Sequence, residues 1–379
     1  MSFLPKIRVA VLFGGRSAEH EVSLRSAENV IRNLDPERFD VIPIGIDKQG
    51  NWTMSNNIFA RSLEQNNVPK LTDDESAWFT PDWVGKAVNK TTEPALAKPG
   101  HQFDVVFPVV HGSLSEDGTL QGLLELAGLP YVGCGVLSSA VGMDKDISKR
   151  LIMQANIPVA PFIVFKKDQW QANPDIVTQQ IEKSIGYPCF IKPANTGSSV
   201  GITKVKTPEA LAVAIQEALK FDVKVIIEKA LNIVELEVAV LESLEDNADP
   251  IVSVVGEIKS RHEFYSYEAK YLDENGAELL IPATSIDDAT KEEARNVAKK
   301  IFRTLDCEGM ARIDLFYDKD ARQICFNEIN TIPGFTQISM YPKLMQASGI
   351  EYAALLTHLI HLAIKRQGNK SQLLRSYTD

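Results

Sequence analysis

Four side chains near the C-terminus could together bind a divalent cation and stabilise negative charge. Asp314, Glu328 and Asn330 supply carboxylate and amide oxygens, and Arg312 supplies a guanidinium group. Mg²⁺ favours such oxygen ligands together with phosphate oxygens and water, and a nearby arginine suits a reacting oxygen on which negative charge develops. On spacing alone, a solvated strand face that carries a salt bridge explains these residues equally well.

These residues belong to two segments that predict a β-hairpin. Residues 310–317 (MARIDLFY) and 323–330 (QICFNEIN) have the alternation of strands, and a three-residue turn over 320–322 joins them. In that register the acidic residues of the two strands face each other, and the arginine faces the asparagine. All four side chains are therefore expected on one surface of the hairpin.

A glycine- and serine-rich loop in the middle of the chain could bind phosphate. The sequence FIKPANTGSSVG, residues 190–201, predicts a strand that contains Lys192 and runs into Gly197, Ser198 and Ser199. Backbone amides and hydroxyls of such a loop can surround phosphate oxygens. The residue order of a Walker A motif is absent, and without it an ordinary flexible turn is the simpler interpretation.

The N-terminal third of the chain predicts a doubly wound, parallel α/β domain. Residues 7–13, 39–46 and 103–110 are apolar, β-branched runs with helical patterns between or after them. Such folds bind ligands at the carboxyl ends of their strands, where this sequence has Glu19 and His111. Glu19 could pair with a substrate ammonium group or merely complement a helix dipole. A lone histidine is more often structural than catalytic.

The middle of the chain alternates strands with helices. Residues 223–229, 236–244 and 251–258 predict consecutive strands of one largely antiparallel sheet, and residues 138–155 predict a helix. The segment 259–277 carries too many functional groups for an idle connection, so we expect a lid. Its candidate side chains are Arg261, His262, Tyr265, Tyr267, Lys270 and Tyr271.

The composition limits the class of protein. With 379 residues, 44% of them hydrophobic, the chain is globular, and 40 basic against 50 acidic residues give a net charge of −10. No basic cluster stands out, which argues against a nucleic-acid partner. The four cysteines form no CxxC pair, which favours a reducing, cytoplasmic setting. Glycines and a proline interrupt the longest uncharged run, residues 126–143, so we expect a soluble protein with no membrane partner.

Seven segments, in order along nearly the whole chain, resemble the D-alanine–D-alanine ligases. They are residues 13–23 (FGGRSAEHEVS), 111–122 (HGSLSEDGTLQG), 143–150 (MDKDISKR), 190–201 (FIKPANTGSSVG), 264–272 (FYSYEAKYL), 310–314 (MARID) and 327–336 (NEINTIPGFT). Any one of them would be weak, whereas seven in the order of the family are specific. The family has an ATP-grasp fold. The resemblance therefore implies an N-terminal substrate-binding domain over 1–133, a central ATP-grasp lobe over 134–230 and a C-terminal lobe with metal site and lid over 231–379.

The resemblance also implies where ATP and two Mg²⁺ ions bind. Lysines contact the phosphates, the glycine-serine loop covers them, the end of a strand contacts adenine, and an acidic residue binds the ribose. The implied nucleotide contacts are Lys145, Lys192, Gly197, Ser198, Ser199, Glu228, Lys229, Ala230, Leu231, Glu235, Lys270, Asn327 and Glu328. Asp314, Glu328 and Asn330 match the metal ligands of the family, and Mn²⁺ is expected to substitute for Mg²⁺.

For the amino-acid substrates, the resemblance implies that Glu19 holds the ammonium group of a first D-alanine and that Ser339 contacts the carboxylate of a second. His111 falls among the substrate-side residues of the family. The implied catalytic residues are Glu19, Ser199, Tyr271, Arg312 and Gly334. Within this set the arginine and the glycine backbone stabilise an oxyanion, and the serine and tyrosine form a network that closes the lid.

The implied reaction is ATP-dependent ligation of two D-alanines through an acyl phosphate, with release of ADP and phosphate, for the synthesis of peptidoglycan precursors. The family is commonly dimeric, so we expect a homodimer. The alternatives are a ligase that takes D-lactate or D-serine as second substrate and a nucleotide-binding regulator that has lost turnover. Tyr271 favours an amine nucleophile, because relatives that make the D-lactate ester commonly have phenylalanine there. An NAD-dependent oxidoreductase would need a glycine fingerprint that the sequence lacks.

The sequence departs from the family pattern at two places. Ser115 replaces a glycine of the HGxxGEDG turn, and residues 232–234 replace the common Gly-x that precedes Glu235. The first change could alter a turn with positive φ near the substrate, and the second could shift Glu235.

Overall fold

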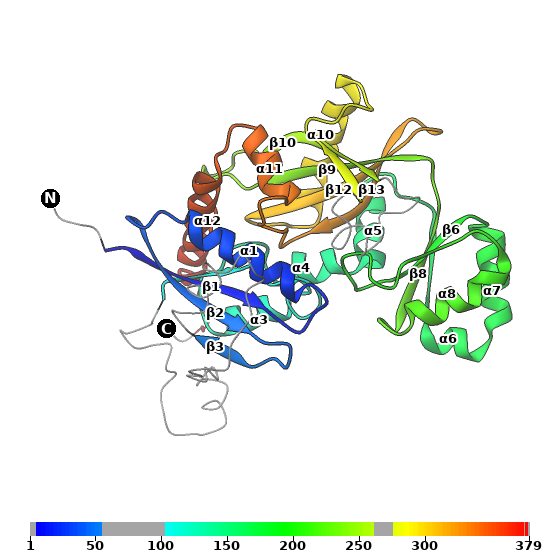
Figure 1. Cartoon of the computed structure of the whole chain (residues 1–379), viewed down its shortest axis with the longest axis horizontal. Helices are drawn as coiled ribbons and strands as arrows, with labels where there is room; N and C mark the ends of the chain where they lie inside the picture. Colours follow the sequence, from blue (N-terminus) through cyan, green and yellow to red (C-terminus); the bar gives the residue numbers. More distant parts are fainter. Residues whose placement is uncertain (1–4, 55–102, 261–275, 375, 378–379) are drawn as a thin grey trace.

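The computed structural model describes residues 5–54, 103–260, 276–374 and 376–377, which form three β-sheets covered by helices (Figure 1). The first sheet is parallel at its centre, and the other two are antiparallel. This order confirms the predicted parallel α/β domain followed by two further α+β lobes.

The N-terminal sheet is built from the apolar runs that predicted it. Its elements are β1 (Ile7–Gly14), β2 (Phe39–Ile46), β3 (Trp52–Met54) and β4 (Val105–Pro108), with helices α1 (His20–Asn33) and α3 (Thr119–Leu126). The strand order is β3-β2-β1-β4, and β1 pairs in parallel with both neighbours while β3 is an antiparallel edge. Because β1 is central, it is buried on both faces and reads as a continuous apolar run.

The second sheet has a different composition from the one that the sequence predicted. Its elements are β5 (Phe162–Lys166), β6 (Cys189–Pro193), β7 (Thr203–Val205) and β8 (Lys224–Lys229), covered by α6 (Lys167–Ala172), α7 (Pro174–Ser184) and α8 (Leu211–Ala218), the last preceded by the 3₁₀ turn Pro208–Ala210. The strand order is β5-β8-β6-β7. The prediction that residues 223–229 share a sheet with the next two strands is therefore wrong. Strand β8 lies between β5 and β6, which come earlier in the chain, so its partners could not be found from sequence neighbours.

The third sheet carries the predicted hairpin. Its elements are β9 (Ile233–Leu241), β10 (Ile251–Ser260), β11 (Ala277–Leu280), β12 (Met310–Asp318) and β13 (Gln323–Asn330), in the order β11-β10-β9-β12-β13. Helix α10 (Asp288–Thr304) packs on one face, whereas α11 (Met340–Ala347) and α12 (Tyr352–Ser371) lie on the other, between this sheet and the N-terminal one (Figure 1). One apolar core thus joins the first and third sheets. This shared core fixes the position of one sheet relative to the other.

The helix predicted over residues 138–155 is two helices. These are α4 (Val136–Met143) and α5 (Lys145–Gln154), separated by Asp144, whose backbone is extended. The Asp144 side chain accepts hydrogen bonds from the amides of Asp146 and Ile147 and so begins the second helix. The break places Lys145 in the first turn of α5.

The predicted hairpin register is confirmed from Arg312 to Asp314, but the turn that joins the two strands is not the one predicted. Asp314 pairs with Glu328 and Arg312 with Asn330, whereas the register shifts by one residue beyond Asp314. The shift makes Asn327 a bulge, and the loop that follows Asp318 runs over 319–322. A bulge and a longer loop together give the same pairing as the predicted shorter turn without a bulge.

Among the described helices, no single one is long and apolar enough to cross a membrane, and one pair, α11 with α12, would reach that length only with a bend of 106°.

Candidate functional site

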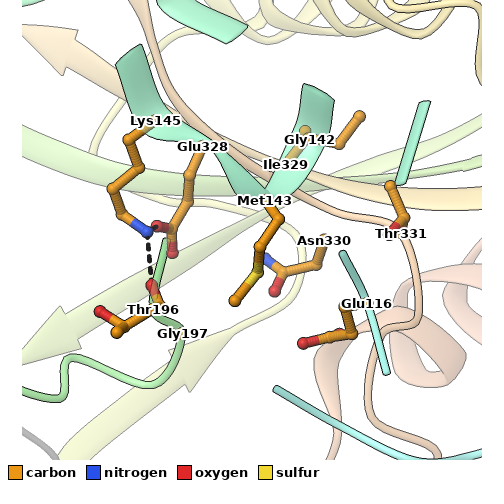
Figure 2. Close-up of a pocket in the computed structure, with 10 residues that line it drawn as sticks. All are labelled: Glu116, Gly142, Met143, Lys145, Thr196, Gly197, Glu328, Ile329, Asn330 and Thr331. Atoms are coloured by element: carbon orange, nitrogen blue, oxygen red, sulfur yellow. Dashed lines mark hydrogen bonds and ion pairs between the residues drawn. The ribbon is translucent and has the colours of Figure 1, made fainter. Parts of the chain in front are cut away.

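A pocket of about 350 Å³, part of it open to solvent, lies where segments from all three sheets meet. Figure 2 shows side chains from α4, α5, β13 and two loops arranged around it. The residues that line it are Glu116, Gly142, Met143, Lys145, Thr196, Gly197, Glu328, Ile329, Asn330 and Thr331. Of the residues expected at the nucleotide and metal sites, Lys145, Gly197, Glu328 and Asn330 are thus brought together.

Lys145 bridges two walls of this pocket. Its Nζ donates to the carbonyl oxygen of Thr196 at 2.7 Å and lies 3.1 Å from Oε2 of Glu328 (Figure 2). The helix break described above positions it, and Lys224 pairs in turn with Asp144. Lys145 is only 5% exposed, so its charge acts in a partly desolvated space where an anionic ligand would gain the most.

The hairpin face presents an all-oxygen set beside an arginine. Asp314 accepts from Nε and Nη2 of Arg312, both at 2.7 Å, and Nδ2 of Asn330 donates to Oδ2 of Asp314 at 3.1 Å. Glu328 lies across the strand pair from Asp314. Two carboxylates with one amide oxygen fit a hard divalent cation that takes its remaining ligands from phosphate and water. The described residues contain no group of three His, Cys, Asp or Glu side chains that could hold a metal ion.

A buried ion cluster joins α5 to the second sheet. Glu228, on β8, receives Lys192 at 2.5 Å on one oxygen and Lys149 at 3.0 Å on the other. Burial raises the pKa of Glu228, but the two lysines outweigh burial and lower the pKa to about 2. Burial lowers the pKa of Lys149, which Glu228 opposes. The carboxylate is therefore ionised, and Lys192 is held at the end of β6 where the glycine-serine loop begins.

Glu19 and the glycine-serine loop contact each other. Ser198 Oγ donates to Oε1 of Glu19, and a Cβ placed on Gly197 would lie 3.4 Å from the other oxygen of this carboxylate. The resemblance implied Ser199 for this network, and its neighbour Ser198 supplies a hydroxyl that contacts Glu19. Both serines have positive φ, 52° and 58°, a conformation that turns the loop sharply toward the first domain.

His111 and Glu116 lie behind Glu19. His111 is 3% exposed, with Nδ1 3.1 Å from the carbonyl oxygen of Ile332 and Nε2 3.4 Å from Ser26 Oγ. Burial lowers the pKa of His111, so the ring is neutral near pH 7. Oε2 of Glu116 accepts from the Gly112 amide at 2.8 Å, and burial followed by the charge of Glu19 raises the pKa of Glu116 well above its usual range.

The turn between His111 and α3 tolerates the serine that departs from the family pattern. Positive φ is found at Gly112, Leu114 and Gly118, and not at Ser115. Ser115 is buried, and its carbonyl oxygen accepts from the side chain of Gln121. The positive-φ positions of this turn are therefore neighbours of Ser115 and not Ser115 itself.

Gly334 and Ser339 lie together after β13. A Cβ on Gly334 would come within 2.7 Å of Ser339 Oγ, so a side chain at this position would require the serine hydroxyl to move. Ser339 Oγ accepts from the Thr336 amide at 3.0 Å and lies 2.7 Å from the Thr336 hydroxyl.

The remaining expected residues are spread around this centre. Lys229 ends β8, the Ala230 amide donates to the Pro188 carbonyl at 3.1 Å, and Leu231 follows before Glu235, which pairs with Phe316 in the strand register. Asn327 is the bulge described above. Lys270, Tyr271 and the other lid candidates lie outside the described residues. Of the segment 259–277, Lys259 and Ser260 belong to β10 and Ala277 begins β11.

Sequence reasoning missed three charged residues of the site. Glu116 lines the pocket, Lys149 is fully buried against Glu228, and Glu237 lies 3.1 Å from Nε of Arg312. Glu116 directly follows Ser115, one of the positions that depart from the family pattern. Lys149 lies one helical turn after Lys145. Glu237 could have been found only by aligning β9 with the hairpin, a pairing that its own sequence does not reveal.

Comparison with known proteins agrees with this geometry. Residues 8–134 match the family model described as D-ala D-ala ligase N-terminus, and residues 151–361 match D-ala D-ala ligase C-terminus. The chain is 47% identical to a D-alanine–D-alanine ligase of Caldicellulosiruptor bescii, over 98% of each chain, and 44% identical to D-alanine–D-alanine ligase A of Escherichia coli K12, over 98% of this chain and 99% of the other.

Solved structures give the same result. The D-alanine–D-alanine ligase of Coxiella burnetii superposes with a TM-score of 0.79 at 33% identity, covering 99% of this chain and 98% of that one. The VanG D-Ala:D-Ser ligase of Enterococcus faecalis superposes with a TM-score of 0.76 at 38% identity, covering 95% of this chain and 100% of that one. The protein has the ATP-grasp fold, and it belongs to the D-alanine–D-alanine ligase family.

Proposed function

We propose that this protein is an ATP-dependent carboxylate-amine ligase that joins two D-alanines to D-alanyl-D-alanine, with release of ADP and phosphate. The observation that carries the proposal is the convergence on one pocket of Lys145 from α5, Glu328 from β13 and the Gly197 loop, with Glu19 against that loop. A phosphate-binding cation, a metal-binding carboxylate and an ammonium-binding carboxylate are the groups that this chemistry requires.

For the nucleotide, we propose that Lys145 and Lys192 contact the phosphates under the loop Gly197 to Ser199. Adenine contacts from Glu228, Lys229, Ala230 and Leu231, a ribose contact from Glu235 and further contacts from Asn327 and Lys270 complete this proposal. Asp314, Glu328 and Asn330 would hold two Mg²⁺ ions, for which Mn²⁺ can substitute. When bound, these ions neutralise phosphate charge during transfer.

For the substrates, we propose that Glu19 binds the ammonium group of the first D-alanine and Ser339 the carboxylate of the second, with His111 as a substrate-side residue. The carboxylate of the first D-alanine attacks the γ-phosphorus, the bond to ADP breaks, and an acyl phosphate forms. The amine of the second then attacks the acyl carbon and phosphate leaves. Arg312 and the Gly334 amide would stabilise the tetrahedral oxyanion.

Catalysis also needs water to be kept from the acyl phosphate. We propose Ser198 as the loop member of the network that starts at Glu19, because its hydroxyl contacts that carboxylate. Ser199 and Tyr271 remain the members implied by the resemblance. His111, which burial keeps neutral, holds α1 and the segment after β13 together through its contacts with Ser26 Oγ and the Ile332 carbonyl oxygen.

We further propose the domain limits 1–133, 134–230 and 231–379, a cytoplasmic homodimer and a role in peptidoglycan precursor synthesis. The family models support the first limit, because the N-terminal one ends at residue 134.

A second candidate is a ligase that takes D-serine as the second substrate. It is favoured by the likeness to the D-Ala:D-Ser ligase of Enterococcus faecalis. Both candidates share the acyl phosphate and differ only in the second amine.

One assay separates the candidates. Phosphate release should require both ATP and D-alanine. When D-alanine, L-alanine, D-lactate and D-serine are supplied together, mass spectrometry should show D-alanyl-D-alanine as the main product. A D-alanyl-D-serine product as the major species would replace the first candidate by the second. ATP hydrolysis with no joined product in any mixture would refute both.

A further inference from the structure

Three acidic residues form one row across three neighbouring strands. In the strand register Asp314 on β12 lies directly opposite Glu237 on β9 and opposite Glu328 on β13. Residues directly opposite each other in antiparallel strands place their side chains on the same face. The row therefore continues the metal-binding face by one strand, to a carboxylate that the ligand set does not include.

Arg312 is shared between two members of this row. It donates through Nε and Nη2 to Asp314, and its Nε also lies 3.1 Å from Oε2 of Glu237. The side chains of Arg312 and Glu237 are only 20% and 12% exposed. A guanidinium in such surroundings needs a carboxylate partner, because an unpaired buried charge is costly.

We infer that Glu237 is a positioning residue that keeps Arg312 in place when Asp314 binds metal. The inference deepens the proposed function, on which it rests. In this role Glu237 acts through Arg312, whose Nε lies 3.1 Å from its Oε2.

The physical reason is competition for Asp314. Both oxygens of this carboxylate accept from Arg312 in the ligand-free arrangement. A divalent cation on Asp314 draws on the same oxygens and repels the guanidinium. With Glu237 ionised on the opposite strand, Arg312 keeps a partner and stays on the sheet face where an oxyanion would form. Without it, Arg312 retains its hydrogen bonds to Asp314 and opposes metal binding there.

Mn²⁺ binding tests this without turnover. Binding is followed by electron paramagnetic resonance with a non-hydrolysable ATP analogue and no D-alanine, for the wild type, E237Q, R312M and the double variant. We expect E237Q to weaken Mn²⁺ binding about 10-fold, and the double variant to bind within about two-fold of R312M, because the competing cation is gone. Equal Mn²⁺ affinity of E237Q and wild type would overturn the inference. It would also be overturned if E237Q lowered Mn²⁺ affinity equally in the wild-type and R312M proteins, because that is the result of a general charge effect.

Glu237→Asp is the second variant, because it keeps the charge but is one methylene shorter. A positioning role predicts weakened binding as in E237Q, whereas wild-type affinity would assign the effect to charge and overturn the inference. Circular dichroism of each variant establishes folding.

Kinetics supply an independent readout. E237Q should lower kcat about 10-fold with KM for ATP within about two-fold of wild type, and should change kcat by less than about two-fold when R312M is already present. Additive losses in kcat would contradict action through Arg312. Because the Mn²⁺ measurement needs no reaction, a protein that failed to join D-alanine would refute the proposed function and leave this inference testable.

Discussion

The buried cluster around Glu228 makes a sharp prediction about stability. Glu228→Gln preserves the shape of the side chain and removes its charge, which leaves Lys149 and Lys192 without their shared partner. Lys149 is 0% exposed and Lys192 is 7% exposed, so solvent cannot replace the carboxylate. We expect E228Q to be strongly destabilised.

The magnitude follows from the pKa of Glu228. A value of about 2, against the ordinary 4.5, means that the folded protein favours the ionised form by about 3 kcal/mol. Removal of one member of a buried ion cluster costs about 3 to 5 kcal/mol, so we expect a loss of about 3 kcal/mol in the free energy of unfolding. Lys149→Met should change this free energy by about 1 kcal/mol or less, because Glu228 keeps Lys192 and a buried ammonium is replaced by an apolar group of similar length.

Denaturation in guanidinium chloride, followed by circular dichroism, measures these differences at pH 7. The control is Glu217→Gln, which breaks the exposed pair with Lys220 and should cost less than about 1 kcal/mol. The double variant E228Q/K149M should be more stable than E228Q, because one unpaired cation is removed. If E228Q matched the wild type, or if the double variant gained nothing over E228Q, the electrostatic reasoning would be refuted.

The pH dependence has a definite sign. The folded pKa of Glu228 is lowered, so its contribution is fully present above pH 4.5 and is lost as the pH falls toward 2. The difference between wild type and E228Q should therefore shrink below pH 4.5. A constant difference would show that Glu228 acts through shape and not through charge.

Four further predictions concern the site and its turns. The folded pKa of Glu116 is raised, so its stabilising contribution is present below pH 4.5 and is lost as the pH rises. The thermal midpoint of the wild type should therefore fall relative to that of Glu116→Gln as the pH is raised above 4.5, and parallel curves would contradict this. Gly118→Ala should cost about 2 kcal/mol, since φ is +89° and a Cβ would meet the Val136 carbonyl oxygen at 2.9 Å, whereas Gly122→Ala, with open space in α3, should stabilise by up to about 1 kcal/mol; denaturant titration gives both values, and equal effects would count against the conformational argument. Ser198→Ala should lower kcat in the phosphate-release assay, because Ser198 contacts Glu19, and an unchanged kcat would count against its place in the network. Chelation by EDTA should abolish phosphate release and added Mg²⁺ should restore it, whereas full activity in EDTA would exclude the metal role of Asp314, Glu328 and Asn330.

Strand positions and the pairing of nearby side chains could be predicted from the sequence, because they depend on spacings of a few residues. The alternation of strands 310–317 and 323–330 predicted that Asp314 faces Glu328, and the structure confirms this pairing. Apolar runs predicted the parallel N-terminal sheet, since a strand buried on both faces needs continuous apolar residues. The break at Asp144 was missed because α4 and α5 are both good helical patterns, and only the cap that Asp144 provides separates them.

Other features of the site depend on contacts between segments far apart in the chain. Strand β8 pairs with β5 and β6 and not with the strand that follows it, and Ser198 meets Glu19 across 179 positions. No periodicity within either segment encodes such a meeting. Lys149 has the position of an ordinary helical lysine, and its full burial against Glu228 is known only once the second sheet is packed on α5.

The order of residues by itself determined which groups could do the chemistry, where the strands run and, through seven motifs, the family. Packing decided the rest. It places Glu237 opposite Asp314 and against Arg312, it buries Glu116 near Glu19 so that the protonated form of Glu116 is favoured, and it brings Lys145 to Glu328. The physical reason is that the charge state and partners of a side chain depend on solvent exclusion and on distances of a few ångströms between remote segments. Those quantities exist only after three sheets have closed around a common pocket.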